Sequence, residues 1–302
     1  MARSHERAFS FARCGRRVAL ACACAPRHNP RVIIPISRPD DPRIAAYRDV
    51  RDRDLARDDG HFIVEGAIAL ERLATAGRFP LSSLLLAESR LAPLEQLIAR
   101  LDPAIPVHAA PQPLMDAIAG FPIHRGVLAL ARRREPETPD QILASLPAGP
   151  LTVLVLIGLA NHDNTGACFR NAAALGASAV LLDETSCDPL YRKSIRVSSG
   201  AALSLPFAQS GDGAGLLAAL AVANITPWLL TPTDAAPLHT LDPPERVAIV
   251  LGAEGHGLPA ALLAGHRRVG IPMANGMDSL NVATAGAVAL AHVLARRPTS
   301  RA

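Results

Sequence analysis

The sequence predicts an α/β protein in which helices pack on a parallel sheet, and three observations point to this fold class. The chain has 302 residues, 49% of them hydrophobic and 19% charged, so it can bury a sizeable core. Strand-like and helix-like segments alternate along most of it. Residues 151–157 are apolar on both faces, as in a buried parallel strand. Since aromatic residues make up only 3%, the core consists of Ala, Leu, Val and Ile.

Residues 1–36 form an arginine-rich extension. They hold seven arginines against one acidic residue, Glu6, whereas residues 37–150 carry a formal charge of −2 and residues 151–302 are neutral. The net charge of +4 therefore comes from the extension and does not argue that the folded part binds RNA. We interpret it as a disordered tail or the product of a start codon placed too early. The short apolar stretch at residues 18–23 leaves open the alternative that the extension is a signal or transit peptide.

Residues 37–134 are expected to form a first, smaller α/β domain. Helices are predicted at 44–55, 67–76, 94–101 and 113–119, and strands at 62–66, 81–87, 105–108 and 126–131. The three arginines at 132–134 and the proline-rich stretch after them indicate a hinge, so residues 135–150 are expected to be a linker.

Residues 151–302 are expected to form a second domain built from β–α units. Strands are predicted at 151–157, 179–182, 227–230, 247–251 and 269–273, a polar loop at 158–165, and helices at 166–175, near 188–199, at 214–223 and after residue 281. In such sheets ligands bind at the carboxyl ends of the strands, so the loops there are the expected site.

The first motif, residues 161–172, leaves the buried strand and enters a helix. Gly166 allows close backbone approach, and the guanidinium of Arg170 can hold a phosphate through its planar fork. The alternative is that Asn161 or Asn164 only caps the helix and Arg170 is a surface charge.

The second motif, residues 250–259, is a glycine-dense turn directly after a strand. Gly252, Gly255 and Gly257 let backbone groups face a ligand. The spacing is not that of a dinucleotide-binding fingerprint, and no phosphate-binding lysine follows. The alternative that this motif is only a turn, without a ligand, therefore stays open.

The third motif lies between residues 269 and 297. A polar turn with Asp278 precedes Ser279, Leu280 and Asn281, which stand at the mouth of the last helix. The first amide groups of a helix lack internal partners, so this junction offers donors to a polar ligand. The alternative is that Asp278 or Ser279 simply caps the helix.

Taken together and in this order, the three motifs are specific. Asn164-x-Gly166-x-x-x-Arg170, then Gly252-x-Glu254-Gly255-x-Gly257-Leu258, then Ile271-Pro272-Met273 with Ser279-Leu280-Asn281-Val282 resembles the SpoU/TrmH branch of the SPOUT RNA methyltransferases. The segment from Ser194 to Ala201 resembles the family's helix between motifs one and two. More loosely, residues 62–66 and 124–127 resemble an L30e-like substrate-binding domain, with rRNA preferred over tRNA as substrate.

The resemblance implies a homodimer in which a deep trefoil knot in the second domain binds S-adenosylmethionine and transfers its methyl group to a ribose 2′-hydroxyl of RNA. Five residues match the family's catalytic and structural polar positions: Asn164, Arg170, Glu254, Ser279 and Asn281. Five would contact the cofactor: Leu251, Gly252, Ile271, Met273 and Leu280. The chain departs from the family at His256, where a lysine is common.

Two other functional classes fit the pattern less well. An RNA-binding protein of the same fold without turnover would not need Arg170, Ser279 and Asn281 together. A nucleotide-dependent oxidoreductase would need a G-x-G-x-x-G after the strand at 151–157, which is absent. The five cysteines include no C-x-x-C pair, and no apolar run is long enough to span a bilayer, so we expect no metal, no membrane and a cytoplasmic location.

Overall fold

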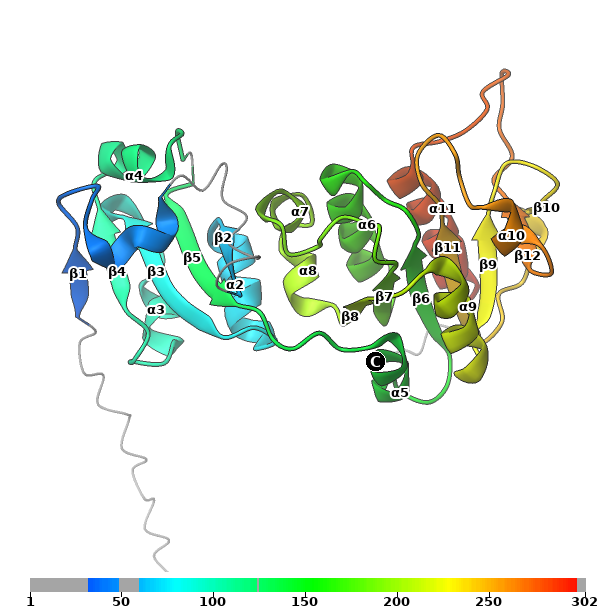
Figure 1. Cartoon of the computed structure of the whole chain (residues 1–302), viewed down its shortest axis with the longest axis horizontal. Coiled ribbons are helices and arrows are strands. Elements are labelled where there is room, and N and C mark those ends of the chain that lie inside the picture. The colour runs from blue at the N-terminus through cyan, green and yellow to red at the C-terminus, as the bar shows by residue number, and fades with distance from the viewer. Residues whose placement is uncertain (1–31, 49–59, 124, 298–302) are drawn as a thin grey trace, which may run out of the picture. The chain divides into compact units, whose positions relative to one another are not determined.

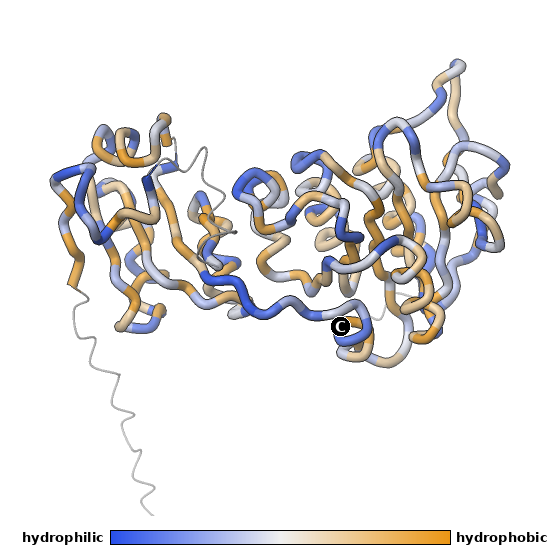
Figure 2. Tube along the Cα trace, viewed as in Figure 1, coloured by the Kyte–Doolittle hydropathy of each residue, from blue (hydrophilic) through white to orange (hydrophobic). Residues whose placement is uncertain are grey.

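The computed structural model describes residues 32–48, 60–123 and 125–297, and these residues form two separate sheets (Figure 1). Most of the extension, residues 49–55 of the first expected helix, and His124 lie outside the described residues. Figure 2 shows that the strands of both sheets are predominantly apolar and that the stretch between the sheets is strongly polar.

The first sheet has five strands in the order β1-β4-β3-β5-β2 and mixes parallel with antiparallel pairs. Its strands are β1 (Ile33–Pro35), β2 (His61–Glu65), β3 (Leu81–Ala87), β4 (Val107–Ala110) and β5 (Val127–Arg132). Its helices are η1 (Pro42–Tyr47), α2 (Ala67–Ala76), η2 (Glu88–Arg90), α3 (Glu95–Arg100) and α4 (Gln112–Ala119). One apolar core lies on each face of the sheet, and the L30e-like assignment stays a prediction.

The second sheet has seven strands in the order β10-β12-β9-β11-β6-β7-β8, all paired in parallel, which confirms the predicted fold class. The strands are β6 (Leu151–Leu156), β7 (Ala179–Leu182), β8 (Phe207–Gln209), β9 (Thr226–Leu230), β10 (Ala236–Pro237), β11 (Arg246–Leu251) and β12 (Arg267–Gly270). The strand order reverses at β6, so the loops after β6 and β11 lie side by side at the carboxyl edge. The knot stays a prediction.

Helices cover both faces of this sheet, as its double-sided apolar strands require. They are α5 (Pro139–Ser145), α6 (His162–Ala174), α7 (Arg192–Val197), α8 (Ala201–Ser204), α9 (Gly213–Val222), η3 (Leu238–Thr240), α10 (Ala260–Leu263) and α11 (Val282–Arg296). Leu154 and Leu156 belong to the core that also contains residues of α6 and α11. Val153 and Val155 belong to the core with residues of α5 and α9.

Several element boundaries differ from the sequence-based expectation. The expected linker contains α5, which begins with a capping box between Thr138 and Gln141. The second half of the expected loop at 158–165 is helix, because Asn161 accepts a hydrogen bond from the amide of Asp163 and starts α6 there. The expected helix near 188–199 is α7 alone, and Gly200 separates it from α8.

The strand expected at 269–273 is shifted toward the N-terminus. It begins at Arg267 and ends at Gly270, so Ile271 and Met273 lie in the following loop. Pro272 has no N–H group to donate to a neighbouring strand, which explains why the ladder ends before it. Strands β1, β8 and β10 were not predicted, because segments of two or three residues carry too little periodicity.

Candidate functional site

Asn281 joins the first motif to the third. Its side-chain oxygen accepts hydrogen bonds from the amides of Ala283 (3.0 Å) and Thr284 (3.3 Å), so Asn281 is the N-cap of α11. Its amide nitrogen donates to the side-chain oxygen of Asn164 on the first turn of α6 (3.0 Å). The alternative interpretation, in which Asp278 or Ser279 caps the helix, is therefore wrong.

A second asparagine bridge, which the sequence analysis did not single out, reinforces this junction. The amide of Asn171 donates to the carbonyl oxygen of Ala283 over 2.9 Å. Asn171 lies seven residues after Asn164, and two helical turns bring the two side chains to the same face of α6. The seven-residue spacing between Asn164 and Asn171 is the feature of the sequence that could have revealed this second bridge.

The glycine turn after β11 is closed by its own backbone. The amide of Gly257 donates to the carbonyl oxygen of Ala253 over 3.0 Å, and these two residues form a β-bridge. A Cβ atom at Gly252 would lie 2.4 Å from the backbone nitrogen of Leu258. Gly255 adopts a φ of +84°, which favours glycine. The second motif is therefore a tight turn in which position 252 has no room for a side chain.

Glu254, on the tip of this turn, is exposed and lies close enough to α6 to influence it electrostatically. Burial, with a smaller effect from the charge of Glu254, raises the pKa of the Cys168 thiol to about 12. Cys168 is only 1% exposed and stays a neutral thiol at physiological pH, so it packs in the core and is not a nucleophile.

The loop between β12 and α11 carries the remaining predicted residues and projects beyond the helices (Figure 1). Ile271 is half-buried against the core and Met273 is half-buried, whereas Ser279 is exposed and Leu280 is 40% exposed. Leu251, at the end of β11, is buried beneath Gly286 of α11. This edge therefore combines apolar side chains with polar groups and the backbone of the glycine turn.

Arg170 lies on another face of α6. Six residues separate it from Asn164, which corresponds to a rotation of about 240° around the helix. It shares a face with Gly166, where a Cβ atom would lie 2.7 Å from the carbonyl oxygen of Ser194 in α7. Arg170 is exposed and has no ion pair with the described residues. The structure thus brings Asn164 and Asn281 into contact but does not place Arg170 against them.

A buried carboxylate that the sequence analysis missed supports the loop after β6. The oxygens of Asp183 accept hydrogen bonds from the amide of Gly158 (2.9 Å) and the hydroxyls of Thr185 and Ser186 (both 2.5 Å). A Cβ atom at Gly158 would lie 3.3 Å from the side chain of Ala253, so this loop abuts the glycine turn. Asp183 therefore fixes the loop that leads into the first motif, where it abuts the glycine turn.

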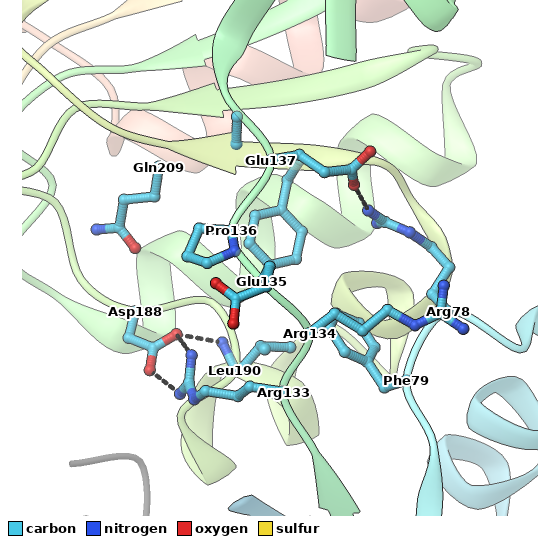
Figure 3. Close-up of a pocket in the computed structure, with 12 residues that line it drawn as sticks. Arg78, Phe79, Arg133, Arg134, Glu135, Pro136, Glu137, Asp188, Leu190 and Gln209 are labelled. Atoms are coloured by element: carbon cyan, nitrogen blue, oxygen red, sulfur yellow. Dashed lines mark hydrogen bonds and ion pairs between the residues drawn. The ribbon is translucent and has the colours of Figure 1, made fainter. Parts of the chain in front are cut away.

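A cavity of about 560 Å³ in the described part of the chain is separate from these motifs. Figure 3 shows the ion pairs that Arg133 forms with Asp188 and Arg78 with Glu137 at its wall. Arg134 and Glu135 also face it, so the formal charges balance. No residue predicted for catalysis or cofactor binding lines this cavity, and it is not the candidate site.

Within residues 32–48, 60–123 and 125–297, no three His, Cys, Asp or Glu side chains cluster as a metal site. No helix of those residues is long and apolar enough to cross a bilayer.

Comparison with known proteins assigns the family. The model of the SpoU rRNA Methylase family matches residues 151–291. An uncharacterized tRNA/rRNA methyltransferase of Mycobacterium bovis is 40% identical over 265 residues, which cover 83% of this chain and 88% of the relative. The 23S rRNA (guanosine-2′-O-)-methyltransferase RlmB of Bordetella pertussis is 32% identical over 61% of this chain and 76% of the relative.

A solved RNA 2′-O ribose methyltransferase superposes with a TM-score of 0.71 at 28% identity. The match covers 88% of this chain and 99% of that one. The three motifs, the parallel sheet and these relatives agree, and the chain belongs to the SpoU rRNA methylase family.

Proposed function

We propose that this protein transfers a methyl group from S-adenosylmethionine to a ribose 2′-hydroxyl of structured RNA. The observation that carries the proposal is the hydrogen bond between Asn164 and Asn281, which joins the first and third motifs beside the glycine turn. The two relatives whose names state the chemistry, RlmB and the solved ribose methyltransferase, act on 2′-oxygens.

The residues at the carboxyl edge suit S-adenosylmethionine. Leu280 offers exposed apolar surface for an adenine ring, and Ile271 and Met273 add half-buried apolar surface. The backbone of the Gly252 turn and the carbonyl groups of the 271–281 loop offer polar partners for the amino-acid part. When bound, S-adenosylmethionine supplies an electrophilic methyl group on a sulfonium. The protein's task is then to hold the acceptor oxygen in line with that methyl group.

Ser279 and Asn281 are proposed to orient the ribose oxygen. Both stand at the mouth of α11, and Asn281 is fixed by three hydrogen bonds, so its position is set before RNA binds. A 2′-hydroxyl is a poor nucleophile, and methyl transfer forms an O–C bond while the S–C bond breaks and the hydroxyl proton leaves. A preorganised polar environment around that oxygen lowers the barrier to this step.

Arg170 is proposed to hold the phosphate next to the acceptor ribose. Its guanidinium is exposed and has no carboxylate partner among the described residues, so it is available to a phosphate. Glu254 is proposed to organise the loops, because its carboxylate acts electrostatically on Cys168 in α6. Arg170 and Asn164 lie on different faces of α6. This supports separate roles, in which Arg170 binds the phosphate and the Asn164–Asn281 pair orients the ribose.

Two finer points belong to the same proposal. We expect a homodimer, since α11 exposes Val288 (39%) and Leu294 (47%), apolar side chains that a second copy would cover. Light scattering on the purified protein tests this.

We also prefer rRNA over tRNA as the substrate, which the name of the RlmB relative supports.

The deciding experiment is to incubate the purified protein with total RNA and methyl-labelled S-adenosylmethionine, then digest the RNA and separate its nucleosides. A labelled 2′-O-methylnucleoside is expected, and separating rRNA from tRNA before digestion identifies the substrate class. Label on a base would refute the ribose mechanism. An absence of label with intact cofactor binding would favour an RNA-binding protein without turnover.

A further inference from the structure

Tyr191 is an exposed aromatic side chain in a protein that has few of them. Aromatic residues make up 3% of the chain, and Tyr191 is the one aromatic among the large apolar side chains that the described residues expose. It is 36% exposed, whereas Tyr47 and Trp228 are each 1% exposed. An aromatic ring left at the surface beside a candidate RNA site calls for a functional reason.

The ring is held in place by its neighbours. Its centroid lies 4.3 Å from that of His162, with the two planes inclined by 45°. Tyr191 is the N-cap residue of α7, and its carbonyl oxygen accepts from the amide of Ile195 over 3.0 Å. The hydroxyl of Ser194 donates to the carbonyl oxygen of His162 over 3.2 Å. A ring that is already ordered loses little entropy when a flat ligand stacks on it.

The ring lies at the end of α6 that also carries Asn164, the hydrogen-bond partner of Asn281. His162 is the first residue of α6 and Asn164 the third, so they are separated by about 3 Å along the helix axis. Lys193 follows Tyr191 by two residues and pairs with Asp163 over 2.7 Å, while its side chain stays 44% exposed. Arg196, one turn after Lys193, is exposed. An aromatic face beside exposed cations is the usual composition of a single-stranded nucleic-acid site.

We propose that Tyr191, backed by His162, is a stacking platform for an unpaired base of the substrate RNA, and that Lys193 and Arg196 bind the phosphates of the same segment. This inference rests on the proposed RNA methyltransferase function and narrows its substrate class. A base within a regular duplex has both faces covered by its neighbours, so a stacking platform requires a loop, bulge or other splayed-out segment.

The test measures RNA binding without methyl transfer. The probe is a single-stranded RNA oligonucleotide that contains 2-aminopurine, whose fluorescence falls when it stacks on an aromatic ring. The purified full chain is titrated as wild type, Tyr191→Phe, Tyr191→Leu and Arg196→Gln. Val222→Ala is the matched control, because Val222 is 82% exposed on α9 and belongs to no proposed site.

We expect Tyr191→Phe and Val222→Ala to bind and quench like the wild type. Tyr191→Leu, which keeps an apolar contact with His162 but has no aromatic face, should lose the quenching and about five- to a hundredfold in affinity. Arg196→Gln should keep the quenching and reduce the slope of log affinity against log salt by about 0.7, the value for one phosphate contact on a single strand.

Absence of quenching by the wild type, or equal quenching by the wild type and Tyr191→Leu, would overturn the platform. Affinity for S-adenosylmethionine should be the same in all variants, and a parallel loss of it in Tyr191→Leu would show a structural role instead. Failure of the proposed ribose chemistry would appear separately, as label on a base in the nucleoside assay, while the quenching result would stand.

Discussion

Replacing Asn281 should separate its role as helix cap from its role as bridge to α6. Asn281→Ala removes two hydrogen bonds to the amides of Ala283 and Thr284 and one to Asn164. Loss of an N-cap costs about 1 kcal/mol, and loss of a further hydrogen bond costs about 1 kcal/mol. The expected loss of stability is therefore ~2 kcal/mol.

Asn281→Asp is the informative partner of this variant. A carboxylate still accepts from both amides, and its negative charge is favourable at the start of α11. However, a carboxylate cannot donate a hydrogen bond, so the bridge to Asn164 and the proposed contact with the acceptor oxygen are lost while the cap remains. The expected loss of stability is ~1 kcal/mol, while methyl transfer should fall as strongly as in Asn281→Ala, because both variants remove the proposed donor at the acceptor oxygen.

Hydrogen exchange followed by mass spectrometry is the assay that resolves the two roles. The amides of the first turn of α11 should exchange about fivefold faster in Asn281→Ala than in the wild type, which corresponds to the loss of ~1 kcal/mol expected for the cap. In Asn281→Asp they should exchange at nearly the wild-type rate. Equal exchange in Asn281→Ala and the wild type would refute the capping argument. Wild-type methyl transfer by Asn281→Asp would refute the proposed role of the Asn281 amide at the acceptor oxygen.

The other predictions test single contacts. Arg170→Ala should abolish methyl transfer and leave S-adenosylmethionine affinity nearly unchanged, since its side chain is exposed and unpaired with described residues; equal loss of both, by labelling and calorimetry, would show a structural role. Gly252→Ala should lower the melting temperature and cofactor affinity together, because its Cβ would lie 2.4 Å from backbone atoms; an unchanged melting curve would contradict that geometry. Cys168 should resist alkylation of the native protein at pH 8, as peptide mapping will reveal. Folding raises the pKa of the Cys168 thiol from 9.0 to about 12, so the thiol ionises in the unfolded chain before it does in the folded protein. The free energy of unfolding should therefore fall as pH rises from about 9 to 12. In Cys168→Ala this alkaline fall in the free energy of unfolding should be shallower.

The sequence predicted the second sheet well because its strands are long and apolar on both faces. β6, β7 and β11 lie at or within a few residues of their predicted positions. The start of α6 was placed late, because the polar residues His162, Asp163 and Asn164 look like a loop until the cap at Asn161 is known. Periodicity alone does not distinguish a polar first turn from a turn outside the helix.

The candidate site was predictable as a set of motifs but not as a set of contacts. The order of the motifs identified Asn164 and Asn281, yet their hydrogen bond depends on how α6 and α11 pack, which no local pattern encodes. Asp183 was missed for the same reason, since an isolated aspartate after a strand gives no sign that three donors will converge on it. The rotation of Arg170 away from Asn164 followed from their six-residue spacing, but only once the segment was known to be one helix.

The two asparagine bridges between α6 and α11 also bear on how the protein acquires activity. They join residues that are 117 and 112 positions apart in the chain, so α6 can form early but must wait for the last helix to complete the site. Contacts of such long sequence separation form late in folding, because the intervening loop must close first. During synthesis, partly made chains would thus hold the first motif without its partner. Competence to bind and modify RNA would then appear as a single event, only after α11 has been made.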